Sequence, residues 1–111
     1  SDTTVKKRFA EFGRERTEDF IMIREADIRG SGYDTSYRAE RFRRIYGEML
    51  ETNAPFSESE LNISGADIMR ELGLPPGSDV GRIKHRLLLR CAAHPEENRR
   101  ETLLKRMHDC R

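Results

Sequence analysis

Residues 63–98, ISGADIMRELGLPPGSDVGRIKHRLLLRCAAHPEEN, carry the clearest fold signals of this 111-residue chain. Ser64 and Asp67, three residues apart, form a capping-box pattern, in which each side chain bonds the backbone N–H of the other residue. The pattern predicts a short helix that runs through Leu72 and ends at Gly73.

A stiff turn, Pro75-Pro76-Gly77, follows that helix, and we expect Ser78 or Asp79 to cap the start of the next one. This second helix should end before Pro95, because proline cannot continue the hydrogen-bond ladder. Its inward positions recur at helical spacing and are Val80, Ile83, Leu87, Leu88 and Cys91.

The same periodicity continues on both sides of this stretch. It predicts four more helices, at about residues 3–13, 20–30, 35–52 and 96–108. Asp2 or Thr3 should cap the first of them, and Gly30-Ser31-Gly32 should be a flexible break after the second. The inward positions of the third are Phe42, Ile45, Tyr46, Met49 and Leu50, and the connector at 56–63 should bury Phe56, Leu61 and Ile63. Because no segment alternates with period two, we expect an all-α protein, a compact bundle of five to six helices.

Composition narrows the class of protein. Charged residues make up 37% of the chain and hydrophobic residues 35%, which suits helices with wide solvated faces. No apolar run is long enough for a membrane span and no signal-peptide pattern opens the chain, so we expect a soluble, cytoplasmic protein. The two cysteines are too few for a disulfide framework, and Cys91 should be a buried reduced thiol. Because the chain begins at Ser1 and becomes helical at once, we expect a fragment of a longer protein.

The net charge of +1 hides an asymmetry along the chain. Residues 1–81 hold 12 Lys and Arg against 16 Asp and Glu, which gives −4, whereas residues 82–111 hold 9 against 4, which gives +5. A surface that faces phosphates has this basic character, and chance clustering of surface charge would produce it too.

The residue patterns of a catalytic centre are missing. There is no strand with paired acids beside a Gly-rich turn, the arrangement that holds Mg²⁺ and a triphosphate. The three histidines, His85, His94 and His108, lack metal-ligand spacing and are expected at the surface. We therefore expect no catalytic residue and no metal site in this chain.

The helix start after Pro75-Pro76-Gly77 is the best candidate for a binding site. The backbone amides of Ser78, Asp79 and Val80 would be free donors at the positive end of a helix dipole, where an anion is favoured. Arg82 could then close over a phosphate held there. The alternative is an ordinary turn between two helices with a solvated basic face, in which the Asp79 carboxylate competes for the amides.

Many fixed spacings of this region match one known pattern. The matching residues are Leu61, Ile63, Gly65, Asp67, Gly73, Pro76, Gly77, Val80, Gly81, Ile83, Leu87, Leu88, Pro95 and Asn98, and Arg24, Ala26 and Asp27 match an R-x-A-D signature further upstream. With these residues, about 4–107 of the chain resembles the C-terminal region of bacterial CCA-adding enzymes and their poly(A) polymerase relatives. Ser78-Asp79 departs from the Gly-Pro that is frequent in that family.

The resemblance implies one non-catalytic helical domain over residues 1–111, with a body of about residues 1–54 and a tail of about 55–111. It implies that tRNA is bound at its elbow and acceptor stem, and that Mg²⁺ with CTP or ATP belongs to a separate catalytic head. The implied partners are tRNA and the head and neck domains, and this chain needs no cofactor. Candidate RNA contacts are Gly77, Ser78, Arg82, Lys84, Arg86, Arg90, Arg99, Arg100 and Lys105, extended by Arg41, Arg43 and Arg44.

Two other hypotheses stay open at this point. A helical docking or dimerisation module without RNA contact would expose an apolar patch around Phe9, Phe12, Phe20 and Ile21. A helix-hairpin-helix DNA binder would use the turn at residues 74–81 alone. The sequence does not separate a CCA-adding, A-adding or polyadenylating parent.

Overall fold

The computed structural model describes residues 1–31 and 36–110, and for residues 27–31 and 36–38 it describes the backbone alone. Six α-helices and three short 3₁₀ turns make up this part of the chain, and it contains no strand, so the all-α prediction is confirmed. The helices are α1 (Asp2–Phe12), α2 (Arg14–Ser31), α3 (Ser36–Glu51), α4 (Gly65–Leu72), α5 (Ser78–Ala93) and α6 (Arg100–Arg106). The turns are η1 (Glu58–Glu60), η2 (Pro95–Glu97) and η3 (Met107–Cys110).

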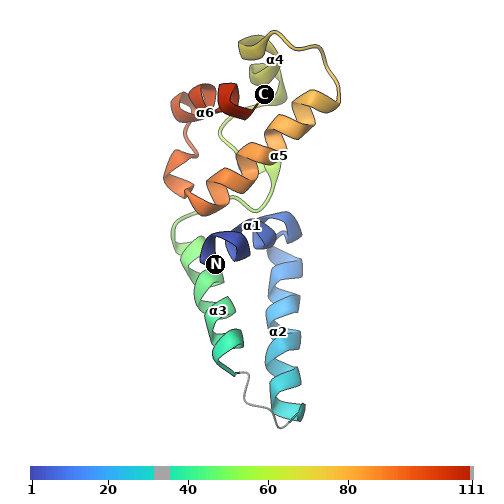
Figure 1. Cartoon of the computed structure of the whole chain (residues 1–111), viewed down its shortest axis with the longest axis vertical. Helices are drawn as coiled ribbons and strands as arrows, with labels where there is room; N and C mark the ends of the chain where they lie inside the picture. Colours follow the sequence, from blue (N-terminus) through green and yellow to red (C-terminus); the bar gives the residue numbers. More distant parts are fainter. Residues whose placement is uncertain (32–35, 111) are drawn as a thin grey trace.

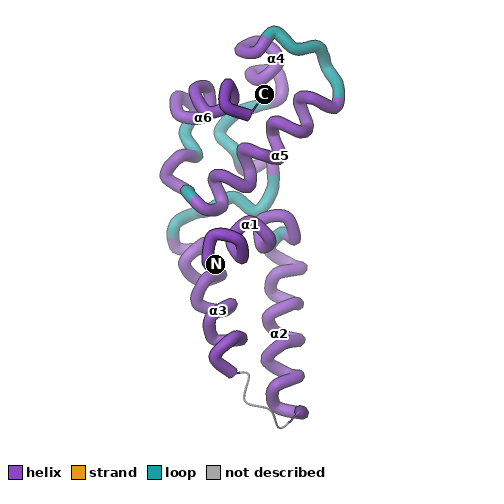
Figure 2. Tube along the Cα trace, in the orientation of Figure 1, coloured by secondary structure: helices purple, strands orange, loops and turns teal. Residues whose placement is uncertain are grey.

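The molecule is long and narrow, with extents of 56 × 25 × 19 Å. Figure 1 shows α2 and α3 side by side at one end and α4, α5 and α6 gathered at the other, with α1 lying across between them. Among the residues drawn in colour in Figure 2, the loops concentrate in the second half of the chain. None of the described helices has both the length and the apolar character needed to cross a bilayer.

One hydrophobic cluster runs through both ends of the molecule. In the first half Phe9 is its centre, with its ring edge-to-face against Phe20, Phe42 and Tyr46 at centroid distances of 6.2, 6.1 and 6.5 Å. α1 packs on α2, α3 and α5, and it therefore joins the two halves. All three predicted plugs of the connector are buried, namely Phe56, Leu61 and Ile63.

The predicted start and end of α4 are confirmed. The Ser64 Oγ accepts from the Asp67 N–H at 3.2 Å, and the Asp67 carboxylate accepts from the Ser64 N–H at 3.0 Å. Gly73 ends the helix in the left-handed conformation, with φ of 64°, which glycine adopts without strain. The inward stripe of α5 is also confirmed, with Val80 half-buried and the other four predicted residues buried.

Four predicted helix ends were wrong. The largest error is the start of α2, which begins at Arg14 and not near residue 20. Ser1 rather than Asp2 or Thr3 caps α1, because the helix starts one residue earlier and the Ser1 Oγ accepts from Thr4 N–H at 3.3 Å. Gly77 is the N-cap of α5, because the helix already includes Ser78 and Asp79 in its first turn. α2 continues through Ser31, and the remainder of the expected break, Gly32, lies outside the described residues.

The last predicted helix is broken into η2, α6 and η3, and Asn98 supplies the reason. Its side chain accepts from the Asn62 N–H at 2.9 Å and donates to the Glu60 carbonyl at 3.0 Å, which ties the chain to the connector before α6 begins. Leu50 is also misassigned: it is 43% exposed, since it lies one residue past Met49 and turns away from the core.

Candidate nucleic-acid interface

The α4–α5 turn presents the start of α5 to solvent. Gly77 caps the helix without any side-chain hydrogen bond, so the amides of the first turn receive no side-chain acceptor from the cap. Gly77, Ser78 and Asp79 are all exposed. The backbone amides at the start of a helix are the donors that bind an anion there.

Gly81 lies in the first turn of α5 and is exposed, and a Cβ built on it would meet nothing within 4 Å. The bare backbone of this first turn is therefore open on its outer side. Open backbone at a helix start leaves room for a bulky polyanion.

Arg82, Arg86 and Arg90 form a row along one exposed side of α5, four residues apart, and we call them the arginine row. Arg82 donates to the Cys110 carbonyl at 3.4 Å and lies 3.7 Å from the Asp79 carboxylate. Burial raises the pKa of the Cys110 thiol, and all three guanidiniums oppose that rise. The arginine row thus lies beside the end of the chain that η3 forms.

Arg106, at the end of α6, lies next to the arginine row and was not among the RNA contacts predicted from the sequence. Glu97 accepts from Arg90 Nε at 2.8 Å and from Arg106 Nε at 3.1 Å, so one carboxylate joins two guanidiniums from α5 and α6. The hydrogen bonds from Arg90 are the main cause of the lowered pKa of Glu97. The charge excess of residues 82–111 included Arg106, but its position relative to Arg90 depends on tertiary packing.

Arg100 does not join this row. Both of its terminal nitrogens bond the Asp67 carboxylate, at 2.8 and 2.9 Å, and fasten α6 to α4. Its guanidinium, with the Ser64 N–H, holds the pKa of Asp67 well below the usual range. The candidate contact at Arg100 is therefore a structural ion pair, which leaves it poorly available for RNA.

The candidates on α3 lie in the other half of the molecule and are also paired. Arg41 bonds Asp2 at 2.8 Å, and Arg44 bonds Glu48 at 2.9 Å and Asp2 at 3.4 Å. Arg43 bonds a carboxylate of α2 at 2.7 Å. These arginines do not extend the surface of α5, since their partners fasten α3 to α1 and α2.

The remaining predicted cations are Lys84, Arg99 and Lys105. Arg99 and Lys105 are exposed, and Lys84 is half-buried on the inner side of α5. Among the described side chains of residues 1–26 and 39–110, no carboxylate lies at ion-pair distance from any of the three, or from Arg86. Among the predicted residues, the structure therefore brings together Gly77, Ser78, Arg82, Arg86 and Arg90, and scatters the others.

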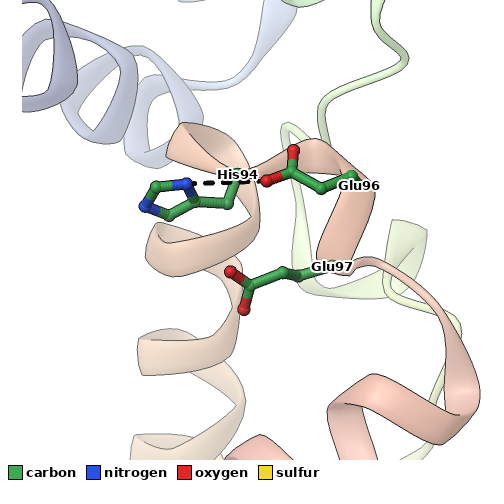
Figure 3. Close-up of side chains that lie close together, drawn as sticks. All are labelled: His94, Glu96 and Glu97. Carbon is green, nitrogen blue, oxygen red and sulfur yellow. Dashed lines mark ion pairs between the residues drawn. The ribbon is translucent and has the colours of Figure 1, made fainter.

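His94, Glu96 and Glu97 meet at the end of α5, with possible ligand atoms within 4.8 Å of one another (Figure 3). His94 Nδ1 lies 3.7 Å from a Glu96 carboxylate oxygen. The Glu97 carboxylate already pairs with Arg90 and Arg106, and the net positive charge of these three groups opposes a cation at this position. The trio is better described as part of the ion-pair network.

The apolar patch of the docking hypothesis differs in its members. Phe9 and Ile21 are buried, whereas Phe12 is 40% exposed and Phe20 half-buried. Ile23, which was not predicted for the patch, is 61% exposed. The patch lies on α1 and α2 and is separate from the arginine row.

Comparison with known proteins adds no relative: no family model, no curated protein and no solved structure matches the chain.

Proposed function

We propose that this chain is a non-catalytic RNA-binding domain that holds tRNA by its phosphates, at the α4–α5 turn and at Arg82 and Arg86, the two members of the arginine row that Glu97 does not bond. The observation that carries the proposal is the order of groups along α5. Its uncapped start comes first, and Arg82 and Arg86 follow on the next two turns. Amides at a helix start and guanidiniums are the two donor types that proteins use most for phosphate oxygens.

The spacing of the arginine row favours a polymer over a single anion. Residues four apart on a helix are separated by about 6 Å along its axis, so the groups from Ser78 to Arg86 extend over roughly 12 Å. A single phosphate would meet one or two of these groups. A run of backbone phosphates would meet several at once, and affinity would then depend steeply on salt.

The absence of aromatic residues from the second half of the chain favours a folded RNA. All eight Phe and Tyr residues lie between Phe9 and Phe56, and there is no Trp. Sequence-specific recognition of single strands relies largely on stacking of bases against aromatic rings, and α5 and α6 contain no Phe, Tyr or Trp for this. Recognition here would read helix shape and phosphates. The spacings shared with CCA-adding enzymes at residues 61–98 support tRNA as that RNA.

The experiment is a titration of fluorescently labelled tRNA with the chain at several salt concentrations, beside a DNA duplex of similar length. We expect tRNA affinity to fall linearly with salt on a double-logarithmic plot, and Arg82→Ala/Arg86→Ala to reduce the slope by about 1 to 2 units. Arg43→Ala is the control, because its side chain is as exposed as that of Arg82, 47% against 46%, but lies on α3, away from the proposed RNA surface. Salt-independent binding, or an equal effect of the control, would contradict the proposal.

A further inference from the structure

Two adjoining hollows on the first half of the molecule share the side chains of Phe12 and Phe20. One, of about 280 Å³, extends toward Val5 and Phe42, and the other, of about 340 Å³, extends toward Ile23. We call the two together the α1–α2 groove. With Phe12 and Ile23 substantially exposed, it is an apolar surface of the kind that another polypeptide covers.

Cations border the α1–α2 groove. Arg8 lines the first hollow and Arg16 the second, and the Arg24 guanidinium lies 5.2 Å from the centre of the Phe20 ring. Among the described residues that line the two hollows, Asp19 is the one carboxylate.

Arg8 and Arg16 differ from most neighbouring arginines, because those arginines are paired with carboxylates. Arg14 bonds Glu60 at 2.6 Å, and Arg41, Arg43 and Arg44 each bond a carboxylate as described above. Among the side chains that the structure describes, those of residues 1–26 and 39–110, neither Arg8 nor Arg16 has a carboxylate within ion-pair distance. Lys7 and Arg24 are likewise without an ion pair among the described side chains, so three of the four unpaired cations of this half, Arg8, Arg16 and Arg24, border the apolar groove.

We infer that the α1–α2 groove binds an amphipathic helix of another polypeptide, with apolar side chains on one face and Asp or Glu beside them. Two adjoining hollows suit two apolar anchors on successive turns of a helix, which is the helix-in-groove mode of recognition. The acidic flanks would pair with Arg8 and Arg16 and would set orientation and partner choice. This site is separate from the proposed RNA surface, so either can fail without the other.

The test uses two synthetic helical peptides and the whole chain. One peptide carries Leu at positions i, i+4 and i+7 with Glu on both flanks, and its twin carries Lys at every Glu position. Binding is followed by fluorescence anisotropy. Ile23→Glu places a charge in the groove, and Met22→Glu is the matched control, since Met22 is also 61% exposed but does not line either hollow.

We expect the acidic peptide to bind and its basic twin to bind at least about tenfold more weakly. Ile23→Glu should weaken the acidic peptide by about tenfold or more, while Met22→Glu changes it by less than about twofold. Arg8→Glu/Arg16→Glu should reverse the preference between the twins. Circular dichroism of each variant checks that these surface substitutions leave the helices intact.

Five results would overturn the inference. They are absence of binding by the acidic peptide, equal binding of the twins, and equal effects of Ile23→Glu and Met22→Glu. The fourth is occupation of the groove by a second copy, seen as self-association in sedimentation that Ile23→Glu abolishes. Loss of tRNA binding in Arg8→Glu/Arg16→Glu would likewise assign these cations to RNA and overturn it.

Discussion

At the scale of single residues, Asp67 connects local and long-range structure. Its carboxylate accepts from the Ser64 backbone at 3.0 Å and from both terminal nitrogens of Arg100. The hydrogen bonds between Ser64 and Asp67 were predictable, because a capping box is recognised from two suitable residues that are three positions apart. The ion pair between Arg100 and Asp67 was not predictable, since it joins residues 33 positions apart and depends on how α6 packs on α4. Arg100 was consequently misread as an RNA contact.

The first prediction concerns the pH dependence of the Asp67 contribution. Its pKa is lowered in the folded state, so its stabilising effect is fully present above the unfolded value of about 3.9 and is lost progressively as pH falls below it. The difference in thermal midpoint between wild type and Asp67→Asn should be constant between about pH 7 and 5 and shrink below about pH 4. Circular dichroism melts measure it. Asp79→Asn, at an exposed position, is the control, and a difference that does not shrink in acid would contradict the assignment.

The second prediction separates structural from RNA-binding arginines. Arg100→Ala should lower the thermal midpoint, because it leaves the largely buried Asp67 without its partner, and should leave the salt dependence of tRNA affinity unchanged. Arg82→Ala/Arg86→Ala should leave the thermal midpoint nearly unchanged and reduce the salt dependence of tRNA affinity, since these side chains are exposed on α5. Melts and tRNA titrations of the two variants test the contrast. A shallower salt slope in Arg100→Ala would show that this guanidinium contacts RNA.

At the scale of elements, α5 was well predicted in its interior and poorly at its start. Apolar spacing identifies Ile83, Leu87 and Cys91 as inward, because burial of one helix face requires that period. The cap was misplaced by one residue, since side-chain preferences favour Ser78 or Asp79 over Gly77 at the N-cap. The actual start is set by the backbone of the preceding turn. That one-residue difference is what leaves the first amides of α5 without a side-chain partner from the cap.

The third prediction tests those amides by removing one of them. Ser78 is the first residue of α5, a position that tolerates proline, so Ser78→Pro deletes an N–H while keeping the helix. We expect unchanged helical circular dichroism and a loss of tRNA affinity of about threefold to tenfold, the value of one net hydrogen bond. Ser78→Ala keeps the amide and should bind as wild type does. If both variants bind equally well, the start of α5 holds no phosphate.

At the scale of the whole molecule, α1 holds the two halves together. It contacts α2 and α3 on one side and α5 on the other, and His85 of α5 lies 3.8 Å from Glu11 of α1. The number of helices and most inward residues were predictable from periodicity. The crossing position of α1 and the elongated shape were not, because they follow from contacts between elements far apart in the chain (Figure 1).

The fourth prediction tests whether the halves unfold together. Phe9 is 2% exposed at the centre of the first half, and Phe9→Ala should cost about 3–5 kcal/mol, a large part of a small domain's stability. If α1 couples the halves, this change should speed thiol labelling of Cys91, which is buried in the second half. The measurement uses a Cys110→Ser background, with the exposed substitution Met22→Ala as control. Unchanged Cys91 labelling would mean that the halves open independently.

The basic surface of the second half was predicted only in outline. The charge excess after residue 81 correctly drew attention to α5, but a charge count cannot tell Arg86, which has no carboxylate partner in the described chain, from the paired Arg100. Ion pairing decides which cations are available to RNA, and it depends on the folded structure. The α1–α2 groove shows the same limit, since Ile23 and Met22 are equally exposed but one alone lines a hollow.

The most direct test of RNA binding at the start of α5 is an amide chemical-shift titration of the whole chain with a short tRNA acceptor-stem hairpin. We expect the largest shifts on the amides of residues 78–82 and on their neighbours along the arginine row, and only small shifts on the amides of α2 and α3. Shifts concentrated around Phe12 and Ile23, or no shifts at all, would contradict it.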